Sequence, residues 1–193
     1  MGDMARARLR TLVFDTEALR PKNDMDWGIY RTQAGVSCAV TIDYETGIPT
    51  FYTVADSGEW GIDALAKALE EAALVISYNG QGYDIPVISA AVGGRVLGLN
   101  KHVDLWSEIK HALGPERWPA GSWRLGAVCE RTIGFGKGDE GPMAPSLWKD
   151  QKIGRLLTYC YNDVFILWRL CKFVKSYGFV VKPDGKKLEM RLP

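Results

Sequence analysis

The sequence predicts an α/β domain built around a mixed sheet. Three β-favouring segments come first, two of them joined by a short turn, and segments with helical periodicity then alternate with short β-branched strands. Strands joined by a tight turn pair antiparallel, whereas a strand that follows a helix can pair parallel. The length of 193 residues fits one domain at roughly 150 residues per domain.

The first half of the chain supplies three strands, a helix and a fourth strand. Residues 9–18, 36–43 and 49–54 are β-favouring, and residues 44–47 form the turn between the last two. Apolar residues recur at helical spacing over residues 62–73, and residues 74–77 then form a short strand. An antiparallel start followed by a helix and a further strand is expected.

The second half continues the alternation. We expect a helix over residues 84–92, a strand over 102–105 and a helix over 122–132, with Ser122 as its cap. Residues 150–177 carry one long apolar stripe, and Gly178 suits the end of that helix. The core is expected to span residues 9–181, and residues 182–193 to form a short polar tail of a single domain that covers 1–193.

Composition places the chain among globular proteins. Hydrophobic residues make up 47% and charged residues 24%, which excludes disordered and fibrous classes. No signal-peptide core is visible, and no apolar run approaches the roughly 20 residues that a membrane span needs. We therefore expect a cytoplasmic protein with no membrane partner. The four cysteines have neither Cys-x-x-Cys nor zinc-type spacing, so they are expected to be reduced, buried thiols: Cys38, Cys129, Cys160 and Cys171.

The net charge of +1 does not by itself indicate a nucleic-acid-binding protein. A local separation of charge is compatible with this total. If four acids were held in a cation site, the remaining residues would carry a net charge of +5, which suits a polyanion bound beside that site.

Two acids end the first strand. Asp15 and Glu17 are two positions apart, so their carboxylates face the same side of the strand. Two like charges at this distance are unfavourable unless a cation or a shared proton relieves them. A divalent metal site is one interpretation, and an ordinary exposed acidic pair is the other.

A second polar cluster spans residues 77–84, where a strand ends in a glycine-containing turn and Asp84 opens a helix. Turns at strand ends are where α/β sheets place ligands. Asp84 could equally be a simple helix N-cap. Asn79 could contact a substrate backbone, or it could only shape the turn before Gly80.

The third cluster lies on the long helix. Tyr159 and Asp163 are four residues apart, which places the hydroxyl and the carboxylate on one helix face. The alternative is that Asp163 belongs to a solvated face.

Taken in order, the three clusters resemble a known family. Asp-x-Glu on the first strand, Asn-x-x-x-Tyr-Asp after a later strand and Tyr-x-x-x-Asp on the last helix look like the three motifs of DEDD-type 3′–5′ exonucleases. The resemblance covers about residues 9–181 and is to the tyrosine branch, which includes proofreading domains of family B DNA polymerases and stand-alone homologues. The histidine branch is disfavoured because Thr158 stands where it needs histidine, and Ala18 departs from the threonine frequent in the family.

The resemblance implies an RNase-H-like fold: a mixed five-stranded sheet, with three antiparallel strands followed by parallel strands, flanked by helices. It also implies that two divalent cations, Mg²⁺ or Mn²⁺, are bound by carboxylates and cleave by a two-metal mechanism. The implied ligands are Asp15, Glu17, Asp84 and Asp163. Since a tyrosine is almost wholly protonated at neutral pH, Tyr159 is expected to orient the attacking water.

The implied substrate is single-stranded DNA or RNA with a free 3′ end, DNA being favoured, and the products are nucleoside 5′-monophosphates. Thr16, Asn79 and Tyr83 are the expected substrate contacts within the motifs. Other interpretations are a non-catalytic nucleic-acid-binding or docking module that acts with a helicase or polymerase partner in trans, and an endonuclease or resolvase of the same fold. Intact carboxylates disfavour the first, and Tyr159 disfavours the second.

Two long connections are candidate functional loops. Residues 19–35 contain Arg20 and Trp27, which could grip a phosphate and stack on a base, or Trp27 could simply anchor the loop. Residues 134–149 contain Lys137, Trp148 and Lys149, which could border the same groove. Residues 136–141 match a dinucleotide-binding fingerprint, but they follow a predicted helix instead of a strand, so we reject that interpretation.

Overall fold

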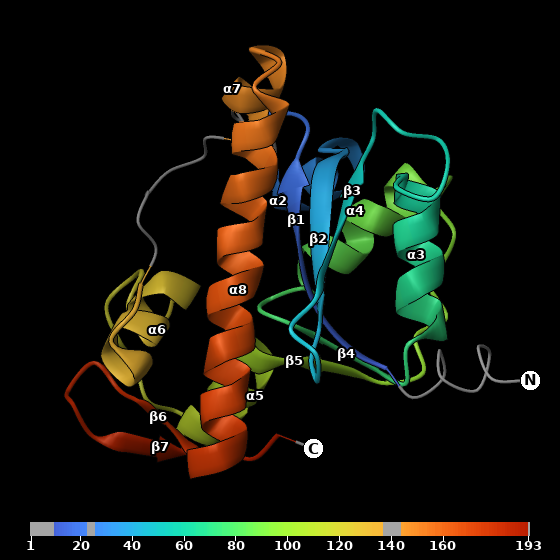
Figure 1. Cartoon of the computed structure of the whole chain (residues 1–193). Helices are drawn as coiled ribbons and strands as arrows, with labels where there is room; N and C mark the ends of the chain where they lie inside the picture. The colour runs from blue at the N-terminus through green and yellow to red at the C-terminus, as the bar shows by residue number, and fades with distance from the viewer. Residues whose placement is uncertain (1–9, 23–25, 137–143, 193) are drawn as a thin grey trace, which may run out of the picture.

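The computed structural model describes residues 10–22, 26–136 and 144–192. A five-stranded sheet with strand order β3-β2-β1-β4-β5 lies at its centre (Figure 1). The first three strands pair antiparallel, and the β1–β4 and β4–β5 pairs are parallel, which confirms the predicted mixed sheet. The strands are β1 (Thr11–Ala18), β2 (Val36–Asp43), β3 (Pro49–Thr53), β4 (Leu74–Ser77) and β5 (His102–Asp104).

Helices cover both faces of this sheet (Figure 1). The long helix α8 packs across β1 and β2 on one face, and α6 packs against α8. Helices α3 and α4 lie on the other face. None of the helices in these described ranges is both long and apolar enough to cross a membrane. The helices are α2 (Trp27–Gln33), α3 (Ile62–Glu71), α4 (Asp84–Ala91), α5 (Leu105–Leu113), α6 (Leu125–Ile133), α7 (Ala144–Lys149) and α8 (Ile153–Tyr177).

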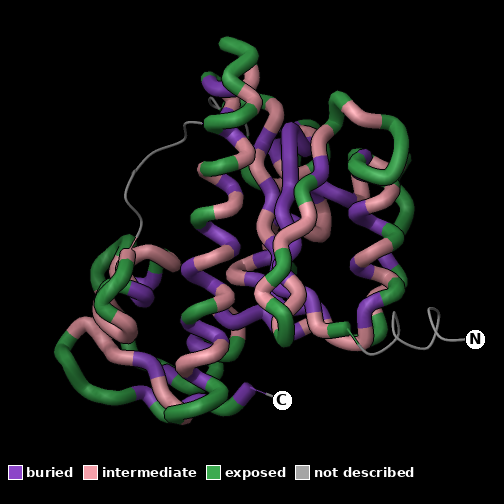
Figure 2. The backbone as a smooth tube through the Cα atoms, viewed as in Figure 1, coloured by how far each residue is buried: buried purple, intermediate pink, exposed green. Residues whose placement is uncertain are grey.

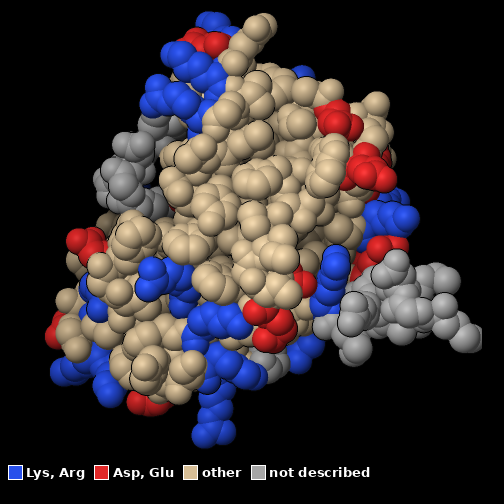
Figure 3. All heavy atoms as spheres, in the orientation of Figure 1, with Lys and Arg blue, Asp and Glu red and all other residues tan. Residues whose placement is uncertain are grey.

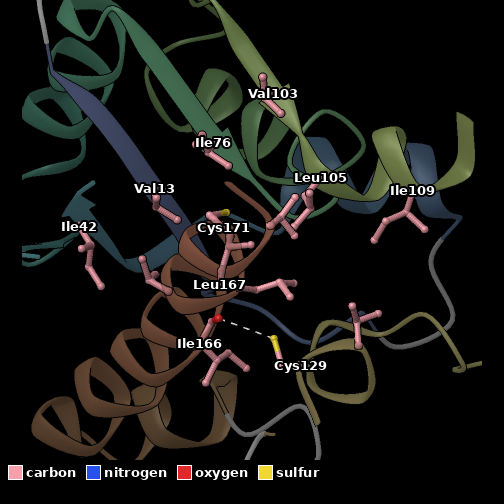
Figure 4. Packing of buried hydrophobic residues seen from close by; sticks show 14 of the residues in the cluster. Val13, Ile42, Ile76, Val103, Leu105, Ile109, Cys129, Ile166, Leu167 and Cys171 are labelled. Atoms are coloured by element: carbon pink, nitrogen blue, oxygen red, sulfur yellow. Dashed lines mark hydrogen bonds between the residues drawn. The ribbon is translucent and has the colours of Figure 1, made fainter. Parts of the chain in front are cut away.

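Successive side chains of β1 point to opposite faces of the sheet and so belong to two hydrophobic cores. Leu12 and Phe14 pack toward α3 and α4, whereas Val13 joins the core beneath α8. Figure 2 shows β2 as almost continuously buried, whereas Asp15 and Glu17 of β1 are only partly buried. In the α8-side core the Cys129 thiol donates to the carbonyl of Ile166 at 3.6 Å (Figure 4). All four cysteines are buried and none forms a disulfide within the described residues.

Helix boundaries follow local backbone signals. Helix α8 ends at Gly178, which adopts φ of 76° in the left-handed region, as predicted. It begins at Ile153 and not at 150, because Gln151 has φ of 56° and interrupts the helical path after α7. Helix α6 begins at Leu125, so Ser122 is not its cap; the Ser122 carbonyl instead accepts from the Arg131 guanidinium at 2.7 Å.

The prediction that residues 182–193 form only a short polar tail is wrong. Strands β6 (Phe179–Val181) and β7 (Lys187–Glu189) pair as an antiparallel hairpin. Leu188, Met190 and Leu192 are buried in the core beneath α8. The hydrophobic core therefore extends beyond residue 181, because these three alternating apolar residues cover the lower end of α8 (Figure 1).

Both long connections contain a helix. Residues 19–35 include α2, whose N-cap Asp26 accepts from the Gly28 amide at 2.7 Å. Residues 134–149 include α7, which contacts β1 and β2. Short helices without a long apolar repeat leave little periodic signal in sequence. Residues 137–143, and with them Lys137 and most of the rejected fingerprint, lie outside the described residues.

Candidate metal centre

The strand β1 delivers two carboxylates to one face of the sheet. Asp15 and Glu17 follow Val13 on the side that α8 covers, and both are partly exposed, whereas Val13 is fully buried. Thr16 lies between them and points to the opposite face, where it is 5% exposed. The pairing with β2 shifts register between Glu17 and Ala18. The predicted shared face of the two acids is therefore present.

Helix α8 brings a third carboxylate to the same place. Asp163 is 4% exposed, which contradicts the alternative of a solvated helix face. One carboxylate oxygen each from Asp15, Glu17 and Asp163 lie within 4.8 Å of one another. Three acids from two elements far apart in sequence thus converge at one end of β1.

A hydrogen bond from a thiol joins α8 to β1 beside the three acids. The Cys160 thiol donates to the main-chain carbonyl of Asp15 at 3.6 Å. Burial, reinforced by the neighbouring Cys38 and by the nearby carboxylates, raises the pKa of Cys160 well above its ordinary value. A thiol that stays protonated acts as a donor and not as a metal ligand, so the ligands offered at this centre are oxygens.

Asp84 is held on the other side of Asp15. It is the first residue of α4 and is 2% exposed. Its Oδ1 accepts from the Thr16 amide at 3.1 Å and from the Thr16 hydroxyl at 2.5 Å. The N-cap of α4 is Tyr83, and no side chain caps it, so the interpretation of Asp84 as a simple N-cap is wrong. Its carboxylate is instead directed to β1.

Burial raises the pKa of Asp84 to about 6, and the hydrogen bonds from Thr16 counteract part of that effect. The Asp15 side chain also hydrogen-bonds to Asp84, so two carboxyl groups are in contact. Two ionised carboxylates side by side repel each other, and a bound cation would supply the compensating charge.

The residues present fit a divalent metal site. The converging ligands are carboxylate oxygens, which hard cations such as Mg²⁺ and Mn²⁺ prefer. Asp84 is not among the three acids that meet within 4.8 Å, but it touches Asp15. The arrangement can hold positive charge at the end of β1 with Asp84 as an outlying fourth acid.

Tyr159 and Asn79 line one cavity. Tyr159 precedes Asp163 by one turn of α8. Asn79 has φ of 66°, and its carbonyl accepts from the amides of Gly82 and Tyr83 at 3.1 Å. Asn79 therefore shapes the turn that leads into α4, whatever it contributes to a substrate.

Sequence reasoning missed Asp104, which organises that turn. Asp104 is 3% exposed at the end of β5. Its carboxylate accepts from the amides of Asn79 at 2.8 Å and Gln81 at 3.0 Å, and also from the amides of Trp106 and Ser107 at the start of α5. An acid between a strand and an apolar run is a typical helix-cap signal and could have identified it.

Of the expected substrate residues, Tyr83 and Trp27 meet in an aromatic cluster. Their ring centroids are 5.7 Å apart, and Tyr30 lies 6.0 Å from Tyr83. Lys22 lies 4.8 Å from the centroid of the Trp27 ring, which is 43% exposed. The cluster attaches α2 to α4, and Trp27 remains partly exposed within it.

The remaining candidates are placed by α2 and α7. The Arg20 guanidinium donates to the carbonyl of Gln33 at 3.1 Å, so it holds the end of α2. Lys149 is exposed at the end of α7, and Trp148 packs partly against the α8-side core.

Comparisons with known proteins agree with this architecture. A family model described as the RNase_H superfamily matches residues 12–174. The structure resembles that of the family B DNA polymerase from the hyperthermophilic archaeon Pyrobaculum calidifontis, with a TM-score of 0.62 and 18% sequence identity over 86% of this chain. The likeness covers 24% of the polymerase chain and concerns the fold. No curated protein matches the sequence. The expected RNase-H-like sheet is confirmed.

Proposed function

The chain belongs to the RNase H superfamily, and from this premise we propose that it is a metal-dependent 3′–5′ exonuclease acting on single-stranded nucleic acid. We favour DNA over RNA as the substrate and nucleoside 5′-monophosphates as the products. The observation that carries the proposal is the convergence of Asp15, Glu17 and Asp163 within 4.8 Å, with Asp84 against Asp15. These are the acids of the three motifs, and membership of the superfamily supports a nuclease role.

Asp15, Glu17 and Asp163 would hold the cations, and Asp84 would complete the set. When bound, two divalent cations would activate a water and stabilise the leaving 3′ oxygen. Because Asp84 Oδ1 already accepts two hydrogen bonds from Thr16, we infer that Asp84 acts partly through a water. Thr16 therefore positions Asp84, and this role takes the place of the substrate contact expected for its side chain.

The other motif residues would position the substrate. Tyr159 lies one turn of α8 before Asp163, so its hydroxyl would orient the attacking water. Asn79, Tyr83 and the partly exposed Trp27 would contact the terminal nucleotides, whereas Arg20 would act only by holding α2. We also propose that both hydrophobic cores, which share one sheet, form a single working domain.

The proposal is tested by digestion of 5′-labelled single-stranded DNA and RNA of one sequence, with Mg²⁺, Mn²⁺ or EDTA. A parallel reaction contains a closed circle of single-stranded DNA, which has no 3′ end. We expect a metal-dependent ladder that shortens from the 3′ end, faster on DNA, with the circle intact. Cleavage of the circle would indicate an endonuclease. Binding of the strands without shortening in any metal would indicate a non-catalytic module that works with a helicase or polymerase partner.

A further inference from the structure

A large cavity is lined by two residues that neighbour the acids in sequence: Tyr159, one helical turn before Asp163, and Asn79, in the turn that leads to Asp84. Its volume is about 980 Å³, at the upper end of the roughly 300–1,000 Å³ typical of ligand sites. The rest of the wall is rich in large flat rings, which come from the end of β4, the start of α5 and the segment before α6: Tyr78, Trp106, Trp118 and Trp123.

These rings pack against one another, so only small movements are open to them. The centroids of Tyr78 and Trp106 are 6.3 Å apart with the planes at 23°, and Trp106 and Trp123 are 6.4 Å apart. The Tyr78 hydroxyl donates to the Trp123 carbonyl, and burial raises the pKa of Tyr78, so this donor keeps its proton. Trp118 meets Trp123 edge to face at 6.4 Å. Rings fixed in this way lose little conformational entropy when a flat ligand stacks on them.

Two donors in this wall are unsatisfied. The indole N–H groups of Trp118 and Trp123 are buried and have no hydrogen-bond partner among the described residues. An unpaired buried N–H group costs about 1–3 kcal/mol, so native structures rarely keep one without a reason. A ligand whose edge carries carbonyl oxygens or ring nitrogens would offer the missing acceptors after a small movement of the rings.

The rim of the cavity suits a phosphate. Arg124 is exposed at the start of α6 and lines the cavity together with Gly126. No side chain caps the N-terminus of α6, so its first amides add a favourable field for an anion. The exposed Glu130 also lines the cavity, so Arg124 is the group there that would pair with a phosphate. Flat walls, unpaired donors and this guanidinium together match one nucleotide of an unpaired strand.

We propose that this cavity binds an unpaired base of the substrate strand, one or a few nucleotides upstream of the 3′ terminus. The base would stack on the tryptophan rings of the cavity wall, Trp106, Trp118 and Trp123. The proposal rests on the proposed function of the neighbouring acids. It goes further by assigning a base-binding subsite to Trp118 and Trp106, with the indole N–H groups favouring bases that present acceptors. Continuity of the cavity with Tyr159 and Asn79 places this base on the strand that enters the metal centre.

The test measures how binding changes when one base is removed at successive positions of the substrate strand. Single-stranded DNA oligonucleotides of one sequence, each with one abasic nucleotide at a different distance from the 3′ end, are bound to the intact protein in EDTA and followed by fluorescence anisotropy. We expect one position near the 3′ end at which loss of the base weakens binding about tenfold, because stacking on an aromatic residue is worth roughly 1–3 kcal/mol per base. This arm needs no variant and so does not depend on one folding.

Variants of the cavity residues then test whether the sensitive base of the strand binds in this cavity. Trp118→Leu should weaken binding of the intact strand by a similar factor and remove the sensitivity to the abasic position. Trp118→Phe keeps a ring without the N–H donor, so it should retain the sensitivity and lose only part of the affinity. Trp60→Leu is the matched control, since Trp60 is 52% exposed before α3 and outside the cavity.

The outcomes separate this inference from the proposed function. A flat abasic profile, or a sensitive position that persists unchanged in Trp118→Leu, overturns the base-binding subsite; metal-dependent shortening of the same strand would leave the exonuclease proposal intact. Absence of both strand binding and shortening in the wild type overturns the two together.

Discussion

Tyr159 stands one turn before Asp163 and offers a hydroxyl where the attacking water would be oriented. We expect Tyr159→Phe to lower kcat about tenfold to a hundredfold, at or below the lower end of the roughly 10²–10⁴ of a full proton transfer, and to change KM little. Single-turnover cleavage and strand affinity measure the two effects. Tyr161→Phe is the control, since Tyr161 stacks on Phe51 and Phe165 instead. Equal losses in both variants would contradict the orienting role.

The two histidines differ in burial and so in their effect on stability. Burial lowers the pKa of His102, with Asp104 opposing the shift, and the imidazole lies 2.8 Å from the Ser77 hydroxyl. A group whose folded pKa lies below its unfolded value gives stability that is present above the unfolded pKa and is lost as the pH falls through the folded pKa.

His102 should therefore contribute a loss of stability as the pH falls below about 6.5, the ordinary pKa of histidine. We expect His102→Gln to show less of this loss than the exposed-site control His111→Gln. Urea unfolding midpoints at several pH values between neutral and mildly acidic measure it. The same pH slope in both variants would show that His102 is not responsible.

At the scale of elements, one buried carboxylate joins β5, the β4–α4 turn and α5. We expect Asp104→Asn to lower the free energy of unfolding by about 1–3 kcal/mol, because it gives up charged hydrogen bonds to four main-chain amides. Since the turn carries Asn79 and leads to Asp84, kcat should fall as well.

Asp43→Asn is the matched control for Asp104→Asn. Asp43 accepts from the amides of Glu45 and Thr46 in a turn that takes no part in the metal centre. It should lose stability without losing kcat when measured by urea unfolding and by initial cleavage rates. A normal kcat in folded Asp104→Asn would rule out a positioning role.

Sequence patterns predicted the elements whose signal is local. The period of α8, its end at Gly178 and the five strands of the sheet follow from spacing and backbone preference. Helices α2 and α7 were missed because each is too short to show a period. The β6–β7 hairpin was missed because Leu188 is buried by the packing of β7 against β6 and α5, which its polar neighbours in sequence do not indicate.

In the candidate site, too, some features follow from local sequence and others exist only in the folded chain. Motif spacing placed Asp15 and Glu17 on one face, but spacing could not show that Asp84, 68 positions away from Thr16, receives two hydrogen bonds from it. That interaction exists only once α4 and β1 are assembled. For Asp104 a local signal shows only the cap of α5, whereas its bonds to Asn79 and Gln81 arise from neighbours distant in sequence, as does the grouping of the aromatic rings around the cavity.

At the scale of the whole molecule, charge is unevenly placed despite the net value of +1. On the face that Figure 3 shows, lysine and arginine gather at two ends of the molecule: at the lower end, and at the opposite end around α7 and the start of α8. Lys149, Lys152 and Arg155 are exposed there, near the end of α8 that carries Tyr159 and Asp163. Such a group would neutralise phosphates of a bound strand without regard to sequence.

We expect Lys149→Ala combined with Arg155→Ala to weaken binding of single-stranded DNA of any sequence. The slope of log affinity against log salt should become shallower by about 0.7 for each phosphate that the variant no longer neutralises. Anisotropy titrations at several salt concentrations measure it, with Lys67→Ala on α3 as the control. An unchanged slope would place the strand elsewhere on the surface.

The most direct test of the central claim compares two acids of the same region. Asp163 is buried among the converging carboxylates, whereas Asp150 is exposed and pairs with Lys152 at 3.0 Å. Cleavage rates of 5′-labelled single-stranded DNA in Mn²⁺ are measured for the wild type, Asp163→Asn and Asp150→Asn. We predict that Asp163→Asn loses at least about a thousandfold in rate, as expected for removal of a metal ligand, while Asp150→Asn cleaves like the wild type. Wild-type cleavage by folded Asp163→Asn would contradict the assignment of the active site.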